Sequence, residues 1–481
     1  MQNNNFLWSS DSLKNALQDC LLSNVAENIF ANEIFLDSRK IINNGIFLAI
    51  NGENFDGHDF VPSALTGGAK LAIVSDVSEL AYLEKSQLVV VKNTIEALYL
   101  LAKYQRQQTK AKVIAITGSV GKTTTKEMLQ LCLNAVGKTY FSKGNFNNHL
   151  GLPLSLANMP SDCNYAVFEM GMNHLNEIKP LSQLAKPDIA IITNVKPVHI
   201  EFFNNEQEIA LAKAEIFAGL NASSGQVLIN KNNIHYQFLY QQALQYGIST
   251  ANIFSFSSQN QVSADYTIAS TSIKNINNCQ IEAKEQNNFI NYQINSINQA
   301  IIDNSIIIVA CLHLLKINLD LALKTLETFS NSAGRGKLLE LSCLQKKIFL
   351  LDDTYNASVA SMQAGIADAK NYQKLLQNKR LVLILGDMLE LGEKSLKLHC
   401  EVLDFALQQK PDLLILVGNN FAKAVANYFI KLQNTNFIVY ANANLVACSI
   451  FSLLQNGDFI YIKGSRGIKM ETIINHLTSL C

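Results

Sequence analysis

Short apolar runs alternate with amphipathic stretches along most of the chain. One series of apolar runs occupies residues 113–117, 165–169, 188–194 and 227–230, and a second occupies 348–352, 381–386, 413–418 and 459–463. Strands that are apolar on both faces and separated by helices indicate parallel sheets covered on both sides. The pattern therefore predicts an α/β protein with two large parallel-sheet domains.

Two regions depart from this pattern. The first ~90 residues hold only short strand-like pieces around Gly and Asp turns, at 45–50, 71–74 and 88–91, which predicts a small separate α/β domain. Residues 255–298 are rich in Asn, Ser and Gln, and their short alternating segments predict a polar β-ribbon inserted late in the middle domain. The polar segment SNSAGRG at 330–336 is the best linker. We expect three domains, at 1–92, 93–330 and 331–481.

Length and charge agree with this division and restrict the function. The 481 residues suggest about three domains at about 150 residues each. Because 39 Lys+Arg balance 39 Asp+Glu, the chain has no basic excess with which to bind nucleic acid. The N-terminal residues lack the pattern of a signal peptide, and the longest apolar stretch, 305–315, is far shorter than the ~20 residues that cross a bilayer. We expect no membrane insertion.

Cysteine and arginine are both distributed sparsely. No two of the nine cysteines lie closer than 31 residues, which predicts reduced, mostly buried thiols in a cytoplasmic protein. Only five of the 39 cationic residues are arginines, namely Arg39, Arg106, Arg335, Arg380 and Arg466. Since Arg is suited to binding anions in a bidentate manner, each one is worth locating. Arg106 and Arg380 fall in no motif and are expected at the surface.

The clearest motif is a glycine-rich turn between a strand and a helix. The segment VIAITGSVGKTTT runs from residue 113 to 125, and a helix is expected at 124–135. Its glycines allow backbone amides to face a phosphate, Lys122 supplies charge to the β- and γ-phosphates, and the Thr123 hydroxyl can bind Mg²⁺. Two residues, rather than the usual four, separate Gly118 from Gly121, and a plain strand–helix turn is the alternative. An NKxD motif for guanine is absent from the sequence, so ATP is the expected nucleotide.

Three further residues could complete a nucleotide site. Glu169 ends an apolar strand, where Mg²⁺ ligands gather in parallel sheets, although a solvated strand end is also possible. His199 follows the next strand and could equally be an ordinary loop histidine. Lys213 shares a helix face with apolar neighbours at offsets −4, +3, +4 and +7, which predicts a buried amine with a lowered pKa. A lysine whose ammonium reaches the helix edge is the alternative.

Nine segments of the chain together resemble the Mur ligases. They are DSR (37–39), GSVGKTTTKEM (118–128), GNFNNHLGLPLSL (144–156), EMGMNHLNEI (169–178), ITNVKPVHIEFF (192–203), AKAEIF (212–217), DDTYNAS (352–358), LGDMLELG (385–392) and KGSRGIKMET (463–472). The resemblance implies an N-terminal UDP-binding domain, a central ATPase domain with the phosphate loop and a C-terminal Rossmann-like domain. It also implies an ATP-dependent amide ligase. The last three segments favour the branch that adds D-alanyl-D-alanine to UDP-N-acetylmuramoyl-tripeptide (UDP-MurNAc-tripeptide) for peptidoglycan synthesis.

The resemblance also implies roles for individual residues. In such ligases the substrate carboxylate becomes an acyl phosphate, which the incoming amine then attacks. Catalytic roles fall on Lys122, His199 and Lys213, and Lys213 is expected to be carbamylated. ATP would contact Gly118, Ser119, Val120, Gly121, Lys122, Thr123, Thr124, Asn147, Asn304, Arg335 and Asp353. The other substrates would contact Ser38, Arg39, Asn148, Lys463, Ser465 and Arg466. Two Mg²⁺ ions would be held by Thr123, Glu169, His199 and Lys213.

The sequence departs from the family where adenine is normally bound. Mur ligases usually carry Gly-x-His-Asn and a following Asn, whereas the stretch 298–304 keeps only Asn304 of these residues. Two alternatives therefore stay open: a ligase of the folylpolyglutamate synthase type, which the N-terminal domain disfavours, and a catalytically inactive nucleotide-binding regulator. We expect a cytoplasmic monomer.

Overall fold

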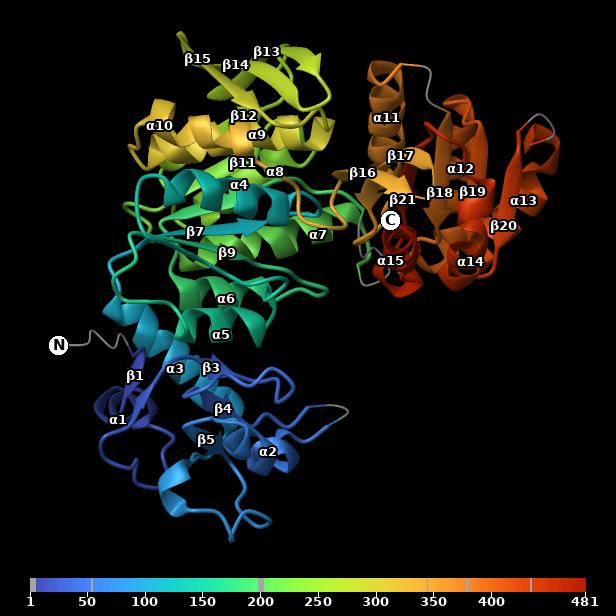
Figure 1. The fold of residues 1–481 in the computed structure, drawn as a ribbon. Helices are drawn as coiled ribbons and strands as arrows, with labels where there is room; N and C mark the ends of the chain where they lie inside the picture. The colour runs from blue at the N-terminus through green and yellow to red at the C-terminus, as the bar shows by residue number, and fades with distance from the viewer. Residues whose placement is uncertain (1–5, 53–54, 198–202, 344, 378–379, 433–434) are drawn as a thin grey trace.

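Three α/β units follow one another along the chain (Figure 1). The computed structural model describes residues 6–481 except 53–54, 198–202, 344, 378–379 and 433–434. Separate sheets of four, nine and six strands form the centres of the N-terminal, middle and C-terminal units. The predicted α/β class and the three-domain organisation are confirmed, whereas the exact limits at 92/93 and 330/331 stay predictions.

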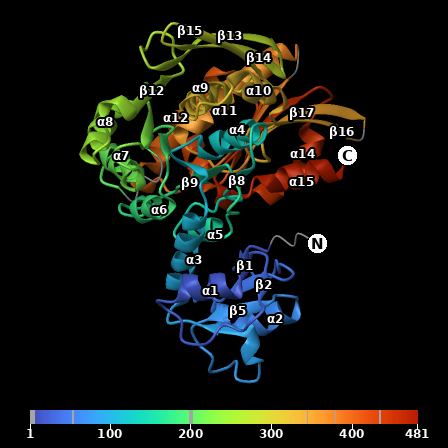
Figure 2. The ribbon, with the colours of Figure 1, turned by 90° about the vertical axis from the view of Figure 1, so that its left-hand side faces the viewer.

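The N-terminal unit is a small parallel sheet with helices on both faces. Its strand order is β3 (Ile34–Phe35), β4 (Ile46–Leu48), β5 (Leu71–Val74) and β6 (Leu88–Val90). One face packs with α1 (Ser10–Leu17) and α3 (Thr94–Gln108), and the other with α2 (Val61–Thr66). Helix α3 continues against the middle unit, so it connects the two units physically (Figure 2). Asn158 of the middle unit strengthens this junction, since its side-chain amide makes two 2.8 Å hydrogen bonds with the backbone of Ile34.

The middle unit is built on one nine-stranded sheet. Its order is β15 (Asn288–Ile294), β14 (Asn278–Glu285), β13 (Tyr266–Asn275), β12 (Ile253–Ser257), β11 (Gln226–Asn230), β10 (Ile189–Ile192), β7 (Lys112–Thr117), β9 (Tyr165–Glu169) and β8 (Thr139–Phe141). From β8 to β13 the strands are parallel. Helices α4 (Lys122–Asn134) and α9 (Gln299–Leu314) cover one face, and α3, α5 (Gly151–Ala157) and α6 (Ile178–Ala185) cover the other. The four strands predicted for this domain all form.

The predicted ribbon exists within the middle unit, but it is not polar on both faces. Strands β13, β14 and β15 pair antiparallel and extend the central sheet at its edge. Cys279, Ile281 and Ala283 on β14 are buried in the same core as α9. One face of the ribbon is therefore core, because alternate residues of a strand point to opposite faces.

The C-terminal unit has six strands and two helical layers. Its order is β16 (Lys337–Cys343), β17 (Lys346–Asp353), β21 (Phe459–Lys463), β18 (Leu381–Gly386), β19 (Leu413–Val417) and β20 (Phe437–Tyr440), with only the edge strand β16 antiparallel. Helices α11 (Val359–Leu375), α12 (Ser395–Gln408) and α13 (Asn419–Leu432) pack on one face, and α14 (Ala443–Leu453) and α15 (Glu471–Ser479) on the other. The carboxyl ends of its parallel strands form the edge at which ligands bind in open sheets of this kind.

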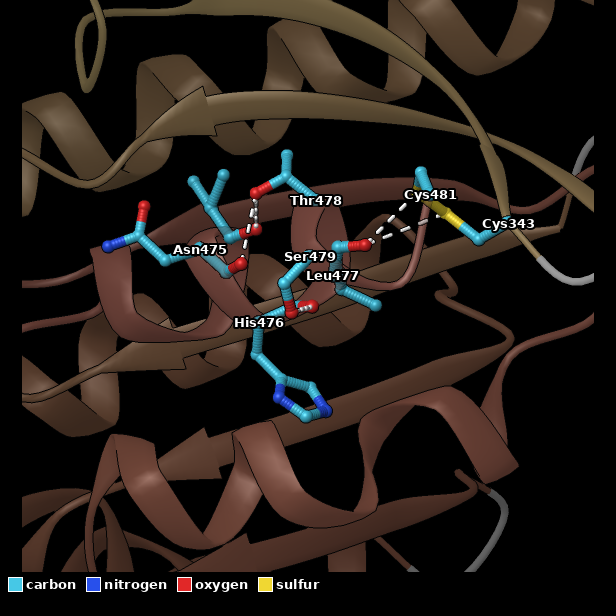
Figure 3. Close-up of a disulfide and its surroundings, with 8 residues drawn as sticks. Cys343, Asn475, His476, Leu477, Thr478, Ser479 and Cys481 are labelled. Atoms are coloured by element: carbon cyan, nitrogen blue, oxygen red, sulfur yellow. Dashed lines mark hydrogen bonds between the residues drawn. A yellow bond between two sulfur atoms is a disulfide. The ribbon is translucent and has the colours of Figure 1, made fainter.

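Cys343 and Cys481 form a disulfide in this unit (Figure 3). Cys343 ends the edge strand β16, and Cys481 follows the terminal helix α15, so the bond ties these two elements together. The prediction of reduced thiols is wrong for this pair, because the fold joins residues that are 138 positions apart in the sequence. The other seven cysteines remain thiols, five of them buried.

Arg106 and Arg380 are not free surface residues, contrary to the prediction. Arg106 donates to the Ala185 and Lys186 carbonyls at the end of α6, at 2.7 and 2.9 Å. Arg380 makes a two-point ion pair with the buried Asp458, at 2.9 and 2.8 Å. Both arginines therefore have structural partners that the linear sequence does not reveal.

The apolar stretch 305–315 lies mainly in α9, whose residues are buried between the sheet and neighbouring helices. Among the described residues, no helix has the length and apolar character needed to cross a membrane.

Candidate active site

A phosphate-binding turn joins the central strand β7 to α4. Gly118 and Gly121 have φ values of 152° and 89°, and Gly121 is the N-cap residue that directly precedes α4. These backbone conformations favour glycine, and they turn successive amides toward the helix N-terminus, where an anion is stabilised. The predicted loop therefore has the conformation that its sequence indicated.

The end of the neighbouring strand β10 holds this turn in place. The Asn194 side chain accepts from the Val120 amide at 3.0 Å, and its backbone carbonyl accepts from the Ser119 amide at 3.1 Å. The Thr193 hydroxyl donates to the Val120 carbonyl at 2.7 Å. These two supporting residues were missed, although both belong to the segment ITNVKPVHIEFF.

Lys122 is the first residue of α4 and lies inside the turn. Its ammonium donates to the Gly118 carbonyl at 2.5 Å. Burial lowers the pKa of Lys122, the charge of Arg335 lowers it further, and Glu169 opposes both effects. Lys122 is partly buried, and a cation inside a phosphate loop supplies the charge that the transferring phosphoryl group requires.

Thr123 and Glu169 face each other across the start of α4. The Thr123 hydroxyl donates to Glu169 Oε2 at 3.1 Å, and Glu169 is 1% exposed, so it is not a solvated strand end. Neighbouring ligands of octahedral Mg²⁺, each about 2.1 Å from the ion, lie about 3.0 Å apart. The spacing and the oxygen donors of this pair thus fit one Mg²⁺ ion.

Lys213 lies in the last turn of α7 (Glu206–Ala214) and is 4% exposed. The pKa of its amine is lowered well below the ordinary value, first by burial and then by the nearby charge of Lys122. The interpretation of Lys213 as an exposed helix-edge lysine is therefore wrong. His199, its predicted companion, lies outside the described residues.

Of the three predicted asparagines, only Asn304 is seen in contact with the phosphate-binding turn among the described residues. A Cβ atom added to Gly121 would lie 2.9 Å from the Asn304 amide nitrogen, so Asn304 contacts the phosphate loop. A Cβ atom on Gly171 would lie 3.0 Å from Asn147 Oδ1, which brings Asn147 to the end of β9. The Asn148 oxygen accepts from the Gly151 amide at 2.9 Å and thereby caps α5.

Arg335 approaches from the linker between the middle and C-terminal units. The Asp352 carboxylate accepts from the Gly334 amide at 2.7 Å, and the Arg335 guanidinium lies 3.9 Å from the centre of the Tyr355 ring. Its charge acts on Lys122, which places it near the phosphate loop. The supporting roles of Asp352 and Tyr355 were missed, although both belong to the DDTYNAS segment.

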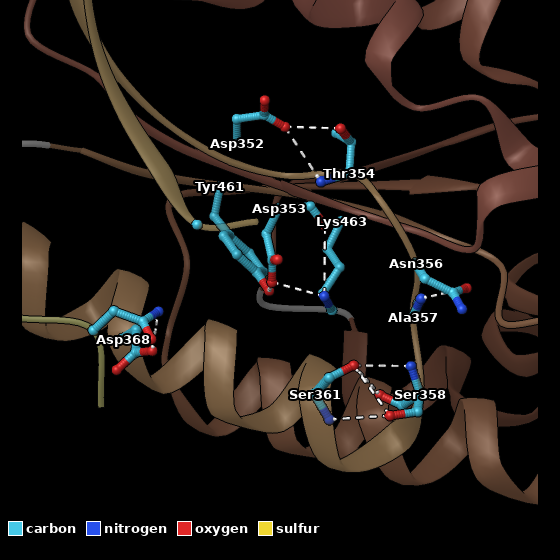
Figure 4. Close-up of polar contacts among 12 residues, drawn as sticks. Asp352, Asp353, Thr354, Asn356, Ala357, Ser358, Ser361, Asp368, Tyr461 and Lys463 are labelled. Carbon is cyan, nitrogen blue, oxygen red and sulfur yellow. Dashed lines mark hydrogen bonds and ion pairs between the residues drawn. The ribbon is translucent and has the colours of Figure 1, made fainter. Parts of the chain in front are cut away.

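Asp353 and Lys463 pair with each other on adjacent parallel strands of the C-terminal unit (Figure 4). The Lys463 ammonium lies 2.7 Å from Asp353 Oδ2, and the Tyr461 hydroxyl donates to the same oxygen at 3.1 Å. Burial raises the pKa of Asp353, and Lys463 opposes this effect. This pair lies at the carboxyl ends of β17 and β21, where the sheet topology places ligand sites.

Ser465 and Arg466 follow the pair on the next loop. The Ser465 hydroxyl accepts from the Leu389 amide at 2.9 Å, which joins the LGDMLELG and KGSRGIKMET segments. Arg466 is exposed, pairs with Glu471 at 3.3 Å, and lies 5.7 Å from the centre of the Tyr355 ring. Arg335 and Arg466 therefore contact the same aromatic side chain.

Ser38 and Arg39 lie after β3 in the N-terminal unit. Arg39 pairs with Asp37 at 2.8 Å and has an 88% exposed side chain. The structure therefore places this predicted UDP-binding pair in a different unit from the phosphate loop.

The altered stretch at 298–304 makes a contact between two units. Asn298 begins α9 and donates its side-chain amide to Asp368 of α11 at 2.8 Å, and the Gln299 amide donates to the same carboxylate at 3.1 Å. Burial raises the pKa of Asp368 to about 7. This end of α9 is thus bound to the C-terminal unit.

Comparison with known proteins agrees with this architecture. Three family models match: "Mur ligase family, catalytic domain" over 31–109, "Mur ligase middle domain" over 116–312, and "Mur ligase, glutamate ligase domain" over 335–466. A relative from Rickettsia prowazekii, named UDP-N-acetylmuramoyl-tripeptide–D-alanyl-D-alanine ligase, is 33% identical over 98% of this chain and 99% of its own.

Solved structures agree as well. A crystal structure of MurF from Acinetobacter baumannii has a TM-score of 0.83 at 27% identity, covering 98% of this chain and 99% of that one. MurF ligase from Thermotoga maritima, solved in complex with ADP, has a TM-score of 0.76 at 22% identity, covering 94% and 99%, and this likeness concerns the fold.

The middle of the three units holds a phosphate loop beside the buried carboxylate of Glu169 and the buried amine of Lys213. This arrangement defines an ATP-dependent ligase, and the chain belongs to the Mur ligase family. Within that family it is similar, over nearly its whole length, to the ligases named for joining D-alanyl-D-alanine to UDP-N-acetylmuramoyl-tripeptide.

Proposed function

We propose that the protein joins D-alanyl-D-alanine to UDP-MurNAc-tripeptide with consumption of ATP, in peptidoglycan synthesis. The observation that carries this proposal is the convergence of Lys122, Thr123 and Glu169 on one turn, with Lys213 buried close to Lys122. A family relationship that extends over the whole chain supports the choice of substrates.

The first half-reaction falls to the middle unit. The loop amides and Lys122 hold the β- and γ-phosphates while a substrate carboxylate oxygen attacks the γ-phosphorus and ADP leaves. Lys122 stabilises the charge on the transferring group, which typically contributes about 3–4 kcal/mol. Thr123 and Glu169 would hold a Mg²⁺ ion, which supplies charge neutralisation along the phosphates when bound.

Lys213 would act in its carbamylated form. Its neutral amine nitrogen bonds to the carbon of CO₂ and loses one proton to solvent, which leaves a carbamate anion. The lowered pKa favours this reaction because only the unprotonated amine is nucleophilic. The carbamate and His199 would then hold or orient a second Mg²⁺ ion.

The second half-reaction joins the two substrates. The amine of D-alanyl-D-alanine attacks the acyl phosphate, and inorganic phosphate leaves from a tetrahedral intermediate. Lys463, Ser465 and Arg466 would position the dipeptide or the acyl phosphate on the C-terminal side.

Binding of the two nucleotides would be divided between units. Ser38 and Arg39 would bind UDP. ATP would be contacted by Arg335, Asp353, Asn147 and Asn304, and Asn148 would lie near the muramoyl substrate. We further propose that the enzyme is a cytoplasmic monomer, and the balance of 39 basic against 39 acidic residues supports the absence of a nucleic-acid partner.

The direct test is a matrix of phosphate-release assays. Release should require ATP, Mg²⁺, UDP-MurNAc-tripeptide and D-alanyl-D-alanine together. Meso-diaminopimelate and L-lysine tripeptides, assayed side by side, identify the third residue. Release with a folate and glutamate instead would point to the folylpolyglutamate synthase alternative, and nucleotide binding without any turnover would point to an inactive regulator.

A further inference from the structure

Lys126 is a buried lysine of the phosphate-loop helix to which the proposed reaction gives no role. It lies one helical turn after Lys122 and is 3% exposed. Its ammonium lies 3.0 Å from Glu169 Oε1 and donates to the Ser142 and Gly144 carbonyls at 2.9 and 3.1 Å. The two carbonyl contacts are hydrogen bonds, whereas the contact with Glu169 is an ion pair, because the buried Oε1 accepts no hydrogen bond from the described residues.

The contact with Lys126 gives the two carboxylate oxygens of Glu169 different partners. Oε1 faces the Lys126 ammonium, and Oε2 accepts from the Thr123 hydroxyl. A metal ion bound beside Thr123 would therefore meet Oε2 alone. Because Mg²⁺ demands near-octahedral geometry, a carboxylate fixed to present one oxygen suits it better than one that is free to rotate.

The two carbonyl contacts extend this support to a second segment. Ser142 and Gly144 begin the loop that leads to Asn147, and Asn147 lies against Gly171 just beyond β9. Lys126 thus joins three parts of the site: the phosphate-loop helix, the strand that carries Glu169, and the 142–148 loop.

We propose that Lys126 is a positioning residue that holds Glu169 for one-oxygen binding of the Mg²⁺ of the bound nucleotide and fixes the 142–148 loop beside it. This inference rests on one part of the proposed function, the binding of a Mg²⁺-nucleotide, and does not depend on the identity of the other substrates. Partners that orient metal ligands typically change metal affinity by about 10–100-fold when they are removed.

The test measures ADP affinity by calorimetry, with Mg²⁺ and with Mg²⁺ removed by a chelator, on the full chain. The readout is the dissociation constant of ADP without Mg²⁺ divided by the dissociation constant with Mg²⁺. A purely structural lysine would not change this ratio. Lys126→Met should reduce this ratio about tenfold or more, and Lys126→Arg should restore part of it. If Lys126→Met does not fold, Lys126→Gln provides the same measurement.

Lys346 offers a matched control, since its ammonium also binds two backbone carbonyls, both at 2.8 Å, but in the C-terminal unit. Lys346→Met should lower thermal stability and leave the ratio unchanged.

A wild-type ratio in folded Lys126→Met would overturn the inference, because Lys126 would then only stabilise the fold. Tighter Mg²⁺-dependent binding in that variant would also overturn it, since Lys126 would then compete with the metal. The proposed ligation can fail independently of this inference. If the parent protein forms no peptide product, the ligation is refuted. If Lys126→Met nevertheless loses the Mg²⁺-dependent gain in ADP affinity, the inference about Lys126 is still supported.

Discussion

The lysines on the middle side and on the C-terminal side of the site have opposite electrostatic surroundings. Near the phosphate loop, the charge of Lys122 lowers the pKa of the buried Lys213. On the C-terminal side, Lys463 is neutralised by Asp353 at 2.7 Å. A lysine whose charged form is disfavoured by a neighbouring cation is stabilised when an anion binds or when its amine becomes an anion, whereas a lysine in an ion pair already has its counter-charge. The comparison teaches that the middle side favours an added anionic group, such as a nucleotide phosphate, whereas Lys463 of the C-terminal side already has its counter-charge within the protein.

The largest loss of activity is expected from a substitution of Lys213, on the middle side of the site. Lys213→Ala should reduce turnover about a thousandfold or more, because the variant loses the carbamate anion and its metal contact. Added short carboxylates should restore part of the activity, measured as phosphate release. Lys110→Ala, at an exposed position, is the control and should retain full activity. Full activity of Lys213→Ala would refute the carbamate role.

Breaking the C-terminal pair should affect stability more than nucleotide binding. Lys463→Met leaves a largely buried carboxylate without its partner, which should cost about 2–3 kcal/mol in the free energy of unfolding, measured with urea. Mg²⁺-dependent ADP binding should not change. Lys347→Met removes an exposed pair with Glu340 and should cost less than about 1 kcal/mol. If Lys463→Met weakened ADP binding as strongly as it lowered stability, the two sides would not be independent.

Asp368, at the contact between the two units, should make stability depend on pH. Its pKa is about 7 in the fold, above the ordinary value, so its contribution is complete below about pH 4 and is lost as the pH rises through 7. Asn cannot ionise, so Asp368→Asn should gain relative to the parent protein by roughly 4 kcal/mol in unfolding free energy between pH 4 and 8.

Asp162→Asn serves as the control for this pH dependence. Asp162 is exposed, and its pKa is lowered by a hydrogen bond from Lys138, so its variant should show a small change of the opposite sign. A pH-independent difference between Asp368→Asn and the parent would contradict the assignment.

The smallest effect concerns the joint between two loops of the C-terminal side. Ser465→Ala removes the acceptor for the Leu389 amide and should cost about 1 kcal/mol in unfolding free energy. The Michaelis constant for D-alanyl-D-alanine should rise while that for ATP stays constant. Equal changes in both constants would show that this loop also serves the nucleotide side.

Local patterns were sufficient to predict most of the fold, the conformation of the phosphate-binding turn and the burial of Lys213. The apolar runs at 165–169 and 381–386 match β9 and β18 in full, because strands buried on both faces leave continuous apolar segments. The apolar neighbours of Lys213 correctly predicted its burial, although α7 ends at Ala214 and Ile216 and Phe217 lie in a 3₁₀ turn.

Contacts that depend on strand order could not be predicted in the same way. Asp353 pairs with Lys463 because β21, the last strand in the sequence, lies between β17 and β18. The disulfide between Cys343 and Cys481 and the ion pair between Arg380 and Asp458 depend on the same arrangement. Residue type and spacing carry no direct information about such partners.

Transfer of an oxygen atom from substrate to phosphate tests the central claim most directly. UDP-MurNAc-tripeptide carrying heavy oxygen in its terminal carboxylate is incubated with the enzyme, Mg·ATP and D-alanyl-D-alanine, and the released phosphate is analysed by mass spectrometry. Activation as an acyl phosphate predicts one heavy oxygen in each phosphate released and the other in the new amide carbonyl. Release of unlabelled phosphate, with both heavy oxygens retained in the tripeptide, would contradict the ligase mechanism.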